Sequence, residues 1–169
     1  MPVKENVKNN KWILKLSNII STPLFWILSF SILTVFAAQV SVPVKPVPFT
    51  LQTMLVLLSG AFLGARNGAL SQVIYLAAGS IGLPVFANFN LGIAVLFGPT
   101  GVYLVAFPVA AYLVGKLLEQ NKSLFMVAVS MVLGTLLILL SGAAYLSLFF
   151  DGILKKHFLP VLLFSPDGM

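Results

Sequence analysis

The sequence predicts an all-α integral membrane protein with five clear spans and the beginning of a sixth. Of its 169 residues, 59% are hydrophobic and only 8% are charged, and the mean hydropathy is +1.05. Soluble domains carry about 25% charged residues, so most of this surface must face lipid. Each crossing of a hydrocarbon core about 30 Å thick takes about 20 residues. The length therefore suits one transmembrane domain over residues 1–169, with little left for a soluble head.

The N-terminal segment, residues 1–20, is basic and precedes the first apolar run. Its four lysines recur at spacings of four, three and four residues, a pattern that suits a short amphipathic helix on the membrane surface. We favour the interpretation that this segment is a solubilising tail that also sets the membrane topology of the chain. A signal peptide is rejected because the following run, residues 23–42, is longer than an apolar core of about 7–15 residues.

Five apolar runs follow, separated by segments rich in proline, glycine or charge. A proline-rich segment, residues 43–48, separates the first two. A charged segment, residues 151–157, follows the fifth run and is interpreted as an outer loop. Residues 158–164 then predict the start of a sixth helix, whose remainder would lie beyond the last residue of the sequence. The five spans are residues 23–42, 49–63, 69–81, 100–118 and 123–150.

The distribution of lysine and arginine predicts the orientation. With a cytoplasmic N-terminus, seven of the ten basic residues lie on the cytoplasmic side and three lie outside. An excess of basic residues marks cytoplasmic loops. We therefore expect a multi-pass protein of the cell inner membrane with its N-terminus in the cytoplasm. The net charge of +6 is assigned to this topology and not to nucleic-acid binding.

Catalytic chemistry is not expected. The chain contains no cysteine and one histidine, and its four carboxylates lie outside the predicted spans. No metal-ligand cluster and no base beside a nucleophile can be assembled from this set. The phosphate-binding motif G-x-x-x-x-G-K-[ST] is also absent. We expect that the chain is not an enzyme and binds neither a cofactor nor a metal. The energy for any uphill transport would come from a partner.

The outer loop, residues 82–99, has an unusual composition. It holds no charge, two asparagines and three phenylalanines. Irregular backbone at membrane depth is tolerated only where protein or a cavity satisfies it. The loop therefore covers a ligand pocket or anchors at the lipid headgroups, and composition does not choose between these. Gln52 and Tyr75, on the preceding spans, either face a neutral ligand or join helices by hydrogen bonds.

Four separate motifs closely resemble the BioY family. They are VPFTLQTMLVLLSG at residues 47–60, LGARNGALSQ at 63–72, YLAAGSIGLPVFA at 75–87 and GPTGVY at 98–103. Proteins of that family are the biotin-binding substrate (S) components of energy-coupling factor (ECF) transporters. The resemblance implies a six-helix bundle in the lipid bilayer that captures biotin from outside. It also implies a transmembrane coupling protein and two ATP-binding cassette ATPases as partners.

The resemblance, together with the chemistry of biotin, implies a set of binding residues. Polar side chains would serve the ureido ring, and phenylalanines would pack against the apolar ring. An aspartate near the C-terminus corresponds to one that the family places before its sixth helix, whereas the lysine that usually follows would lie beyond Met169. The sequence leaves open which group anchors the biotin carboxylate. Lys45, Lys155 and Lys156 are the candidates to substitute for the family's usual lysine. The implied residues are Phe49, Gln52, Tyr75, Phe86, Asn88, Phe89 and Asp167.

A docking face for the coupling protein is implied on the first span. Many S components dock through an Ala-x-x-x-Ala face on this helix, and small residues four apart occur here as well. Ordinary packing against another span is the alternative for these residues. They are Thr34, Ala37, Ala38 and Ser41.

Two other functions stay open at this point. In the first, the chain is an S component for another small vitamin, and competition with desthiobiotin would distinguish this function from biotin binding. In the second, it is a non-transporting membrane scaffold. The scaffold interpretation predicts no ligand. An intramembrane enzyme is the least favoured interpretation because the catalytic groups are missing.

Overall fold

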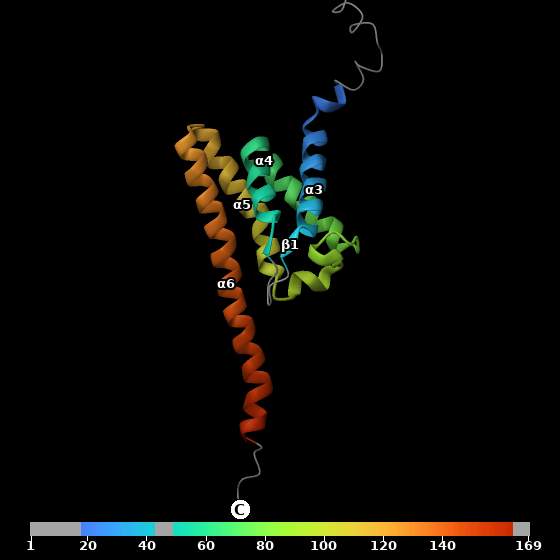
Figure 1. Cartoon of the computed structure of the whole chain (residues 1–169), viewed down its shortest axis with the longest axis vertical. Coiled ribbons are helices and arrows are strands. Elements are labelled where there is room, and N and C mark those ends of the chain that lie inside the picture. Colours follow the sequence, from blue (N-terminus) through green and yellow to red (C-terminus); the bar gives the residue numbers. More distant parts are fainter. Residues whose placement is uncertain (1–17, 43–48, 164–169) are drawn as a thin grey trace, which may run out of the picture.

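The structure, a computed structural model, describes the backbone of residues 18–42 and 49–163 and the side chains of residues 18–42 and 50–148. The basic N-terminal segment up to residue 17 lies outside these ranges. The described chain is a bundle of helices with irregular segments at one end (Figure 1). The elements are α3 (Pro23–Gln39), β1 (Ser41–Val42), β2 (Phe49–Thr50), α4 (Gln52–Ser80), η1 (Ala87–Phe89), η2 (Ile93–Phe97), α5 (Gly101–Gln120) and α6 (Leu124–Leu163).

The helix α4 is a hairpin of two antiparallel halves. The chain reverses at Gly64, whose φ of 79° and ψ of 177° favour glycine because a Cβ penalises this region. The Nε2 of Gln52 lies 2.6 Å from the hydroxyl of Tyr75, although 23 residues of continuous helix would separate them by about 35 Å. The predicted break between the second and third spans is confirmed.

Three helices in the described part are long and apolar enough to cross a membrane. They are Gln52–Ser80, Gly101–Gln120 and Leu124–Leu148. The hairpin in α4 turns the first of these into two shorter segments. The helix α3 is also apolar but has 17 residues, and its predicted last residues, 41–42, instead form β1, which pairs antiparallel with β2.

Small residues allow the helices to approach closely where α4 meets itself and α5. A Cβ on Gly68 would lie 2.7 Å from the Cα of Gly60, and a Cβ on Gly115 would collide with the backbone of Ala65. Larger residues at these positions would force the backbones apart. Small residues are the usual means of close helix packing in membranes.

A buried polar cluster joins α3 to both halves of α4. The Nε2 of Gln72 donates to the hydroxyls of Ser59 and Ser71 at 3.1 Å each, and it lies 3.4 Å from the hydroxyl of Thr34. The Oε1 of Gln72 has no hydrogen-bond partner among the described residues. This glutamine therefore holds helices together, which is one of the two roles that the sequence allows for polar residues on these spans.

The predicted docking face lies mostly inside the bundle. Thr34 and Ala38 are fully buried and Ala37 is 6% exposed, because this side of α3 packs against α4. Ser41 is half-buried in β1 and contacts Asn88. Ordinary packing accounts for the three buried residues in this arrangement, and a docking role for the predicted face stays a prediction.

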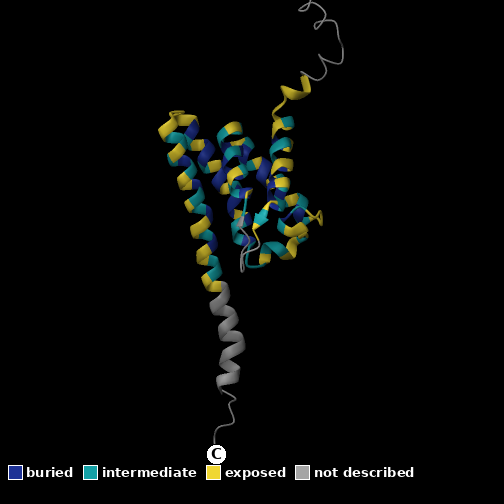
Figure 2. Ribbon diagram, in the orientation of Figure 1, coloured by how far each residue is buried: buried dark blue, intermediate teal, exposed yellow. Residues whose placement is uncertain are grey.

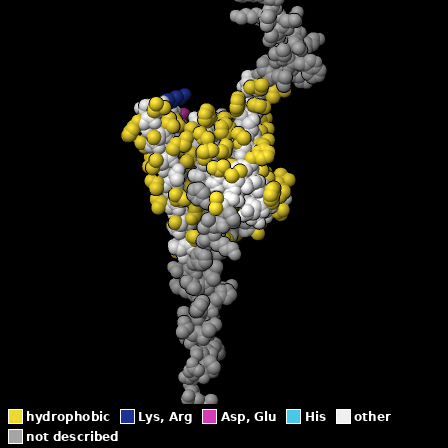
Figure 3. All heavy atoms as spheres, in the orientation of Figure 1, with side chains coloured by type: hydrophobic (Ala, Val, Ile, Leu, Met, Phe, Trp, Pro, Cys, Tyr) yellow, Lys and Arg dark blue, Asp and Glu magenta, His cyan; other side chains and the backbone are white. Residues whose placement is uncertain are grey.

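Many residues along the outside of the helices are exposed (Figure 2), and hydrophobic side chains cover much of the face seen in Figure 3. Phe36, Phe62 and Leu140 are 66%, 75% and 66% exposed. Such a surface suits contact with lipid. All four charged side chains in the described ranges gather near one end, where α4 reverses and α5 ends. They are Arg66, Lys116, Glu119 and Lys122.

The last helix is longer than predicted. α6 runs without interruption from Leu124 to Leu163, so the predicted end of the fifth span at residue 150 and the outer loop over residues 151–157 are wrong. Charge and one glycine suggested a loop there, but a single glycine costs a helix only about 1 kcal/mol. The side chains from residue 149 onward, and Asp167, lie outside the described set.

Candidate binding cavity

A cavity of about 530 Å³ opens at the end of the bundle opposite the charged residues. Its walls come from β2, the start of α4, residues 86–100, the first turns of α5 and the middle of α6. This volume lies within the range of about 300–1,000 Å³ that is typical of small-molecule sites. No charged side chain lines the cavity among the described residues, so its chemistry suits a largely neutral ligand.

Gln52 forms the polar wall at the start of α4. Its side chain is 4% exposed. Its Oε1 accepts a hydrogen bond from Thr50 Oγ1 at 3.0 Å, and its Nε2 donates to Tyr75. A primary amide has two N–H donors and an oxygen with two lone pairs. The two contacts therefore fix the amide orientation and leave one donor and one acceptor position for a ligand.

Tyr75 supports this wall from behind. It is fully buried and does not line the cavity. Its hydroxyl accepts the hydrogen bond from Gln52 and donates to the backbone oxygen of Val85 at 3.3 Å. In this structure Tyr75 supports the wall of the cavity through these two hydrogen bonds, and its direct contact with a ligand stays a prediction.

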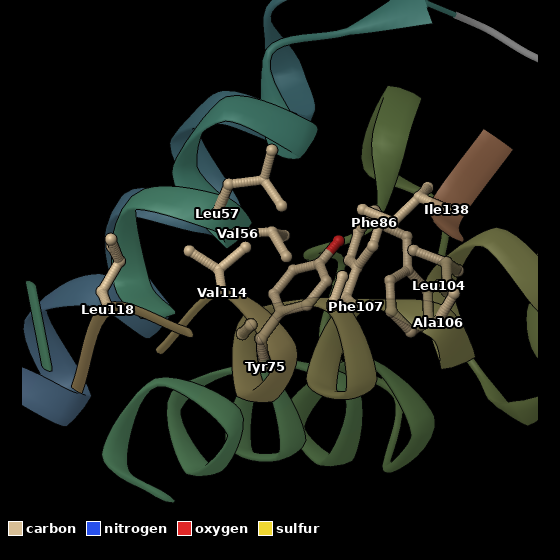
Figure 4. Packing of buried hydrophobic residues seen from close by; sticks show 12 residues of the cluster. Val56, Leu57, Tyr75, Phe86, Leu104, Ala106, Phe107, Val114, Leu118 and Ile138 are labelled. Carbon is tan, nitrogen blue, oxygen red and sulfur yellow. The ribbon is translucent and has the colours of Figure 1, made fainter. Parts of the chain in front are cut away.

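Phe86 closes one side of the cavity. Its ring is 1% exposed and meets Tyr75 edge to face, with ring centroids 5.6 Å apart (Figure 4). The same ring lies directly over Gly79, where a Cβ would collide with it. The absence of a side chain at residue 79 thus lets Phe86 pack onto α4.

The loop around Asn88 has an unusual backbone conformation. Asn88 and Phe89 both have a φ of 57°, a left-handed conformation that asparagine tolerates and that is a strain for most other residues. Asn88 lines the cavity. The side chain of Phe89 is 67% exposed and does not line the cavity, so the predicted packing of Phe89 against a ligand is not supported.

Gln39, at the end of α3, holds this loop from outside. Its Nε2 donates to the backbone oxygen of Phe86 at 3.1 Å, and its Oε1 accepts from the backbone N–H of Phe89 at 3.2 Å. Ser41 Oγ donates to Asn88 Oδ1 at 3.3 Å. Sequence analysis missed Gln39 because the bonded residues lie 47 and 50 positions away along the chain.

The helices α5 and α6 supply the apolar wall, which sequence analysis also missed. Tyr103, Leu104 and Phe107 line the cavity from α5, and Ile138 lines it from α6. Figure 4 shows Leu104, Phe107 and Ile138 close together. These segments have the composition of any transmembrane helix, so hydropathy does not single them out. Two signals in the sequence were available. The spacing of residues 103, 104 and 107 suits one face of a helix, and a tyrosine ends the fourth motif.

The structure thus brings together Gln52, Phe86 and Asn88 from the predicted set. The side chain of Phe49 and the whole of Asp167 lie outside the described residues. Within the described ranges, no group of histidine, cysteine, aspartate or glutamate side chains could hold a metal ion.

These features define a class of protein: a helical membrane protein that encloses a neutral, partly polar cavity at one end. Comparison with known proteins then identifies the family. The sequence model of the BioY family matches residues 8–168. This chain belongs to the BioY family.

Individual relatives agree with this assignment. The chain is 43% identical over 139 residues to the probable biotin transporter BioY of Pyrococcus horikoshii, covering 82% of each chain. It is 42% identical over 126 residues to the biotin transporter BioY of Thermotoga maritima, covering 75% of each. A crystal structure described as the S-component for biotin from an ECF-type ABC transporter matches with a TM-score of 0.71 and 29% identity, over 85% of this chain and 81% of that chain.

Proposed function

We propose that this chain is the biotin-binding S component of an ECF-type transporter. The relatives are named as biotin transporters, and the matching crystal structure is described as the S-component for biotin from an ECF-type ABC transporter. The observation that carries the proposal is the cavity, uncharged over its described lining, in which two hydrogen bonds hold the amide of Gln52 in one orientation. An oriented amide suits the ureido group of biotin, which offers both donors and an acceptor.

The cavity distinguishes the two rings of biotin. The ureido ring lies toward Gln52 and Asn88, whose amides pair with its N–H and C=O groups. The thioether ring packs against Phe86 and Phe107. A ligand without the ureido group would leave buried amide groups unpaired, at a cost of about 1–3 kcal/mol for each group. Polar pairing supplies selectivity, and apolar contact supplies much of the affinity.

The cavity faces outward in this proposal, and the N-terminus is cytoplasmic. The charged residues support this orientation because Arg66, Lys116 and Lys122 all lie toward the opposite end from the cavity. An excess of basic residues is typical of the cytoplasmic side. Biotin captured at the outer end is then carried inward by the S component. A transmembrane coupling protein and two ATPases act as its partners and supply the energy.

A direct test measures saturation binding of tritiated biotin to the detergent-solubilised protein, followed by competition with unlabelled biotin and desthiobiotin. Desthiobiotin keeps the ureido ring and lacks the sulfur, so it should compete. Vitamins without a ureido group should not compete. An absence of saturable biotin binding, or equal competition by an unrelated vitamin, would contradict the proposal.

A further inference from the structure

We propose that Gln39 is a positioning residue that keeps the segment 86–90 closed over the ligand site. The inference rests on the proposed function, because it takes the cavity as the biotin site. It adds a residue outside the cavity that controls how fast the ligand leaves.

The geometry of the amide carries the first part of the argument. One side chain bridges two backbone groups of the same turn, the oxygen of Phe86 at 3.1 Å and the N–H of Phe89 at 3.2 Å. Gln39 is half-buried and does not line the cavity. It therefore acts on the ligand only through the loop that it holds.

The conformation of the loop carries the second part. Asn88 and Phe89 are both left-handed, with a φ of 57°. Phenylalanine strongly disfavours this region, and strained backbone persists only where surrounding contacts hold it. The Oε1 of Gln39 bonds the N–H of the strained residue itself. Without this bond, the loop lowers its free energy when Phe89 returns to a negative φ.

The position of Phe86 links the loop to the cavity. Its backbone oxygen accepts the other hydrogen bond from Gln39, and its ring is 1% exposed against Tyr75 and Gly79. A loop released from Gln39 is free to withdraw this ring from the cavity. The expected consequence is faster dissociation of the ligand, with a smaller effect on association.

The test compares Gln39→Met, which keeps the length of the side chain and removes both hydrogen bonds, with the wild type. Gln120→Met is the matched control, since Gln120 is an exposed glutamine at the far end of α5. We expect Gln39→Met to raise the dissociation rate of tritiated biotin about tenfold, the effect of losing two modest hydrogen bonds. The control should dissociate at the wild-type rate.

A second variant separates positioning from general damage. Glycine adopts a φ of 57° without steric penalty, so Phe89→Gly in the Gln39→Met background should restore much of the slow dissociation. A purely structural role for Gln39 in α3 would give no such rescue. An unchanged dissociation rate in Gln39→Met, or a complete lack of rescue, would overturn the inference.

Hydrogen exchange of the ligand-free protein gives a readout that does not depend on biotin. The amide of Phe89 should exchange faster in Gln39→Met than in the wild type, because its acceptor is gone. Unchanged exchange over residues 86–90 would overturn the proposed role of Gln39. Failure of the wild type to bind biotin would instead contradict the proposed function, while the exchange measurement still decides whether Gln39 holds the loop.

Discussion

The carboxylate of Glu119, near the end of α5, accepts a hydrogen bond from the backbone N–H of Ala65 at 3.0 Å. Ala65 begins the second half of α4, directly after the reversal at Gly64. The first N–H groups of a helix have no partner within it, and negative charge is favourable there. Glu119 therefore caps a helix that lies 54 residues away in the sequence and fixes the hairpin at the end opposite the cavity.

Replacement of this cap should lower the stability of the bundle. We expect Glu119→Ala to reduce the free energy of unfolding by about 1 kcal/mol, the usual effect of losing a helix cap. Thermal unfolding in detergent measures this effect. Glu119→Gln keeps an acceptor oxygen and should lose less. Equal stability of Glu119→Ala and the wild type would show that the contact adds nothing.

The contact between Gly79 and Phe86 gives a prediction about binding. A methyl group at residue 79 would collide with the ring of Phe86 and push it into the cavity. Gly79→Ala should therefore weaken biotin binding at least about tenfold, which corresponds to about 1.4 kcal/mol. Equilibrium binding measures the effect. Adding Phe86→Leu, which shortens the colliding side chain, should recover part of the loss, and an unaffected single variant would argue against the packing.

The two buried glutamines of α4 should respond differently to substitution. Gln52 lines the cavity and is oriented by Thr50 and Tyr75. We expect Gln52→Ala to weaken biotin binding about tenfold or more, since an unpaired buried ureido group costs about 1–3 kcal/mol. Titration with tritiated biotin measures the affinity of the variant. Wild-type affinity would show that Gln52 is not part of the binding site.

Gln72 is the matched control because it is equally buried on the same helix but does not line the cavity. Gln72→Met should leave the affinity for biotin unchanged. It should lower stability by no more than about 1 kcal/mol, because hydrogen bonds between membrane helices are weak and its Oε1 is already unpaired. A large loss of affinity would mean that this cluster controls the cavity.

Much of the fold was accessible from the sequence. Hydropathy located the helices, and the glycines around residue 64 located the reversal of α4, because a chain in lipid must satisfy its backbone within helices. The missing charge in residues 82–99 was compatible with a pocket, whereas Phe86 and Asn88 came from the resemblance to the BioY family and the chemistry of biotin. Hydropathy, glycine content and charge are local properties, which a sequence displays directly.

The rest depended on tertiary contacts. No local pattern reveals that Gln39 reaches Phe86 or that Phe89 turns outward, because the left-handed backbone at residue 89 is imposed by a helix that ends 50 positions earlier. The burial of the small residues of α3 depended on tertiary contacts as well. Small side chains suit both a docking face and an internal contact, and no local pattern shows that these residues pack against α4.

The most direct measurement of the central claim is an experimental structure of the chain with biotin bound. We predict that the ureido ring lies within hydrogen-bonding distance of the Gln52 and Asn88 amides, with the thioether ring against Phe86 and Phe107. Biotin bound elsewhere on the protein, or bound in the cavity with its ureido ring away from Gln52, would contradict the account.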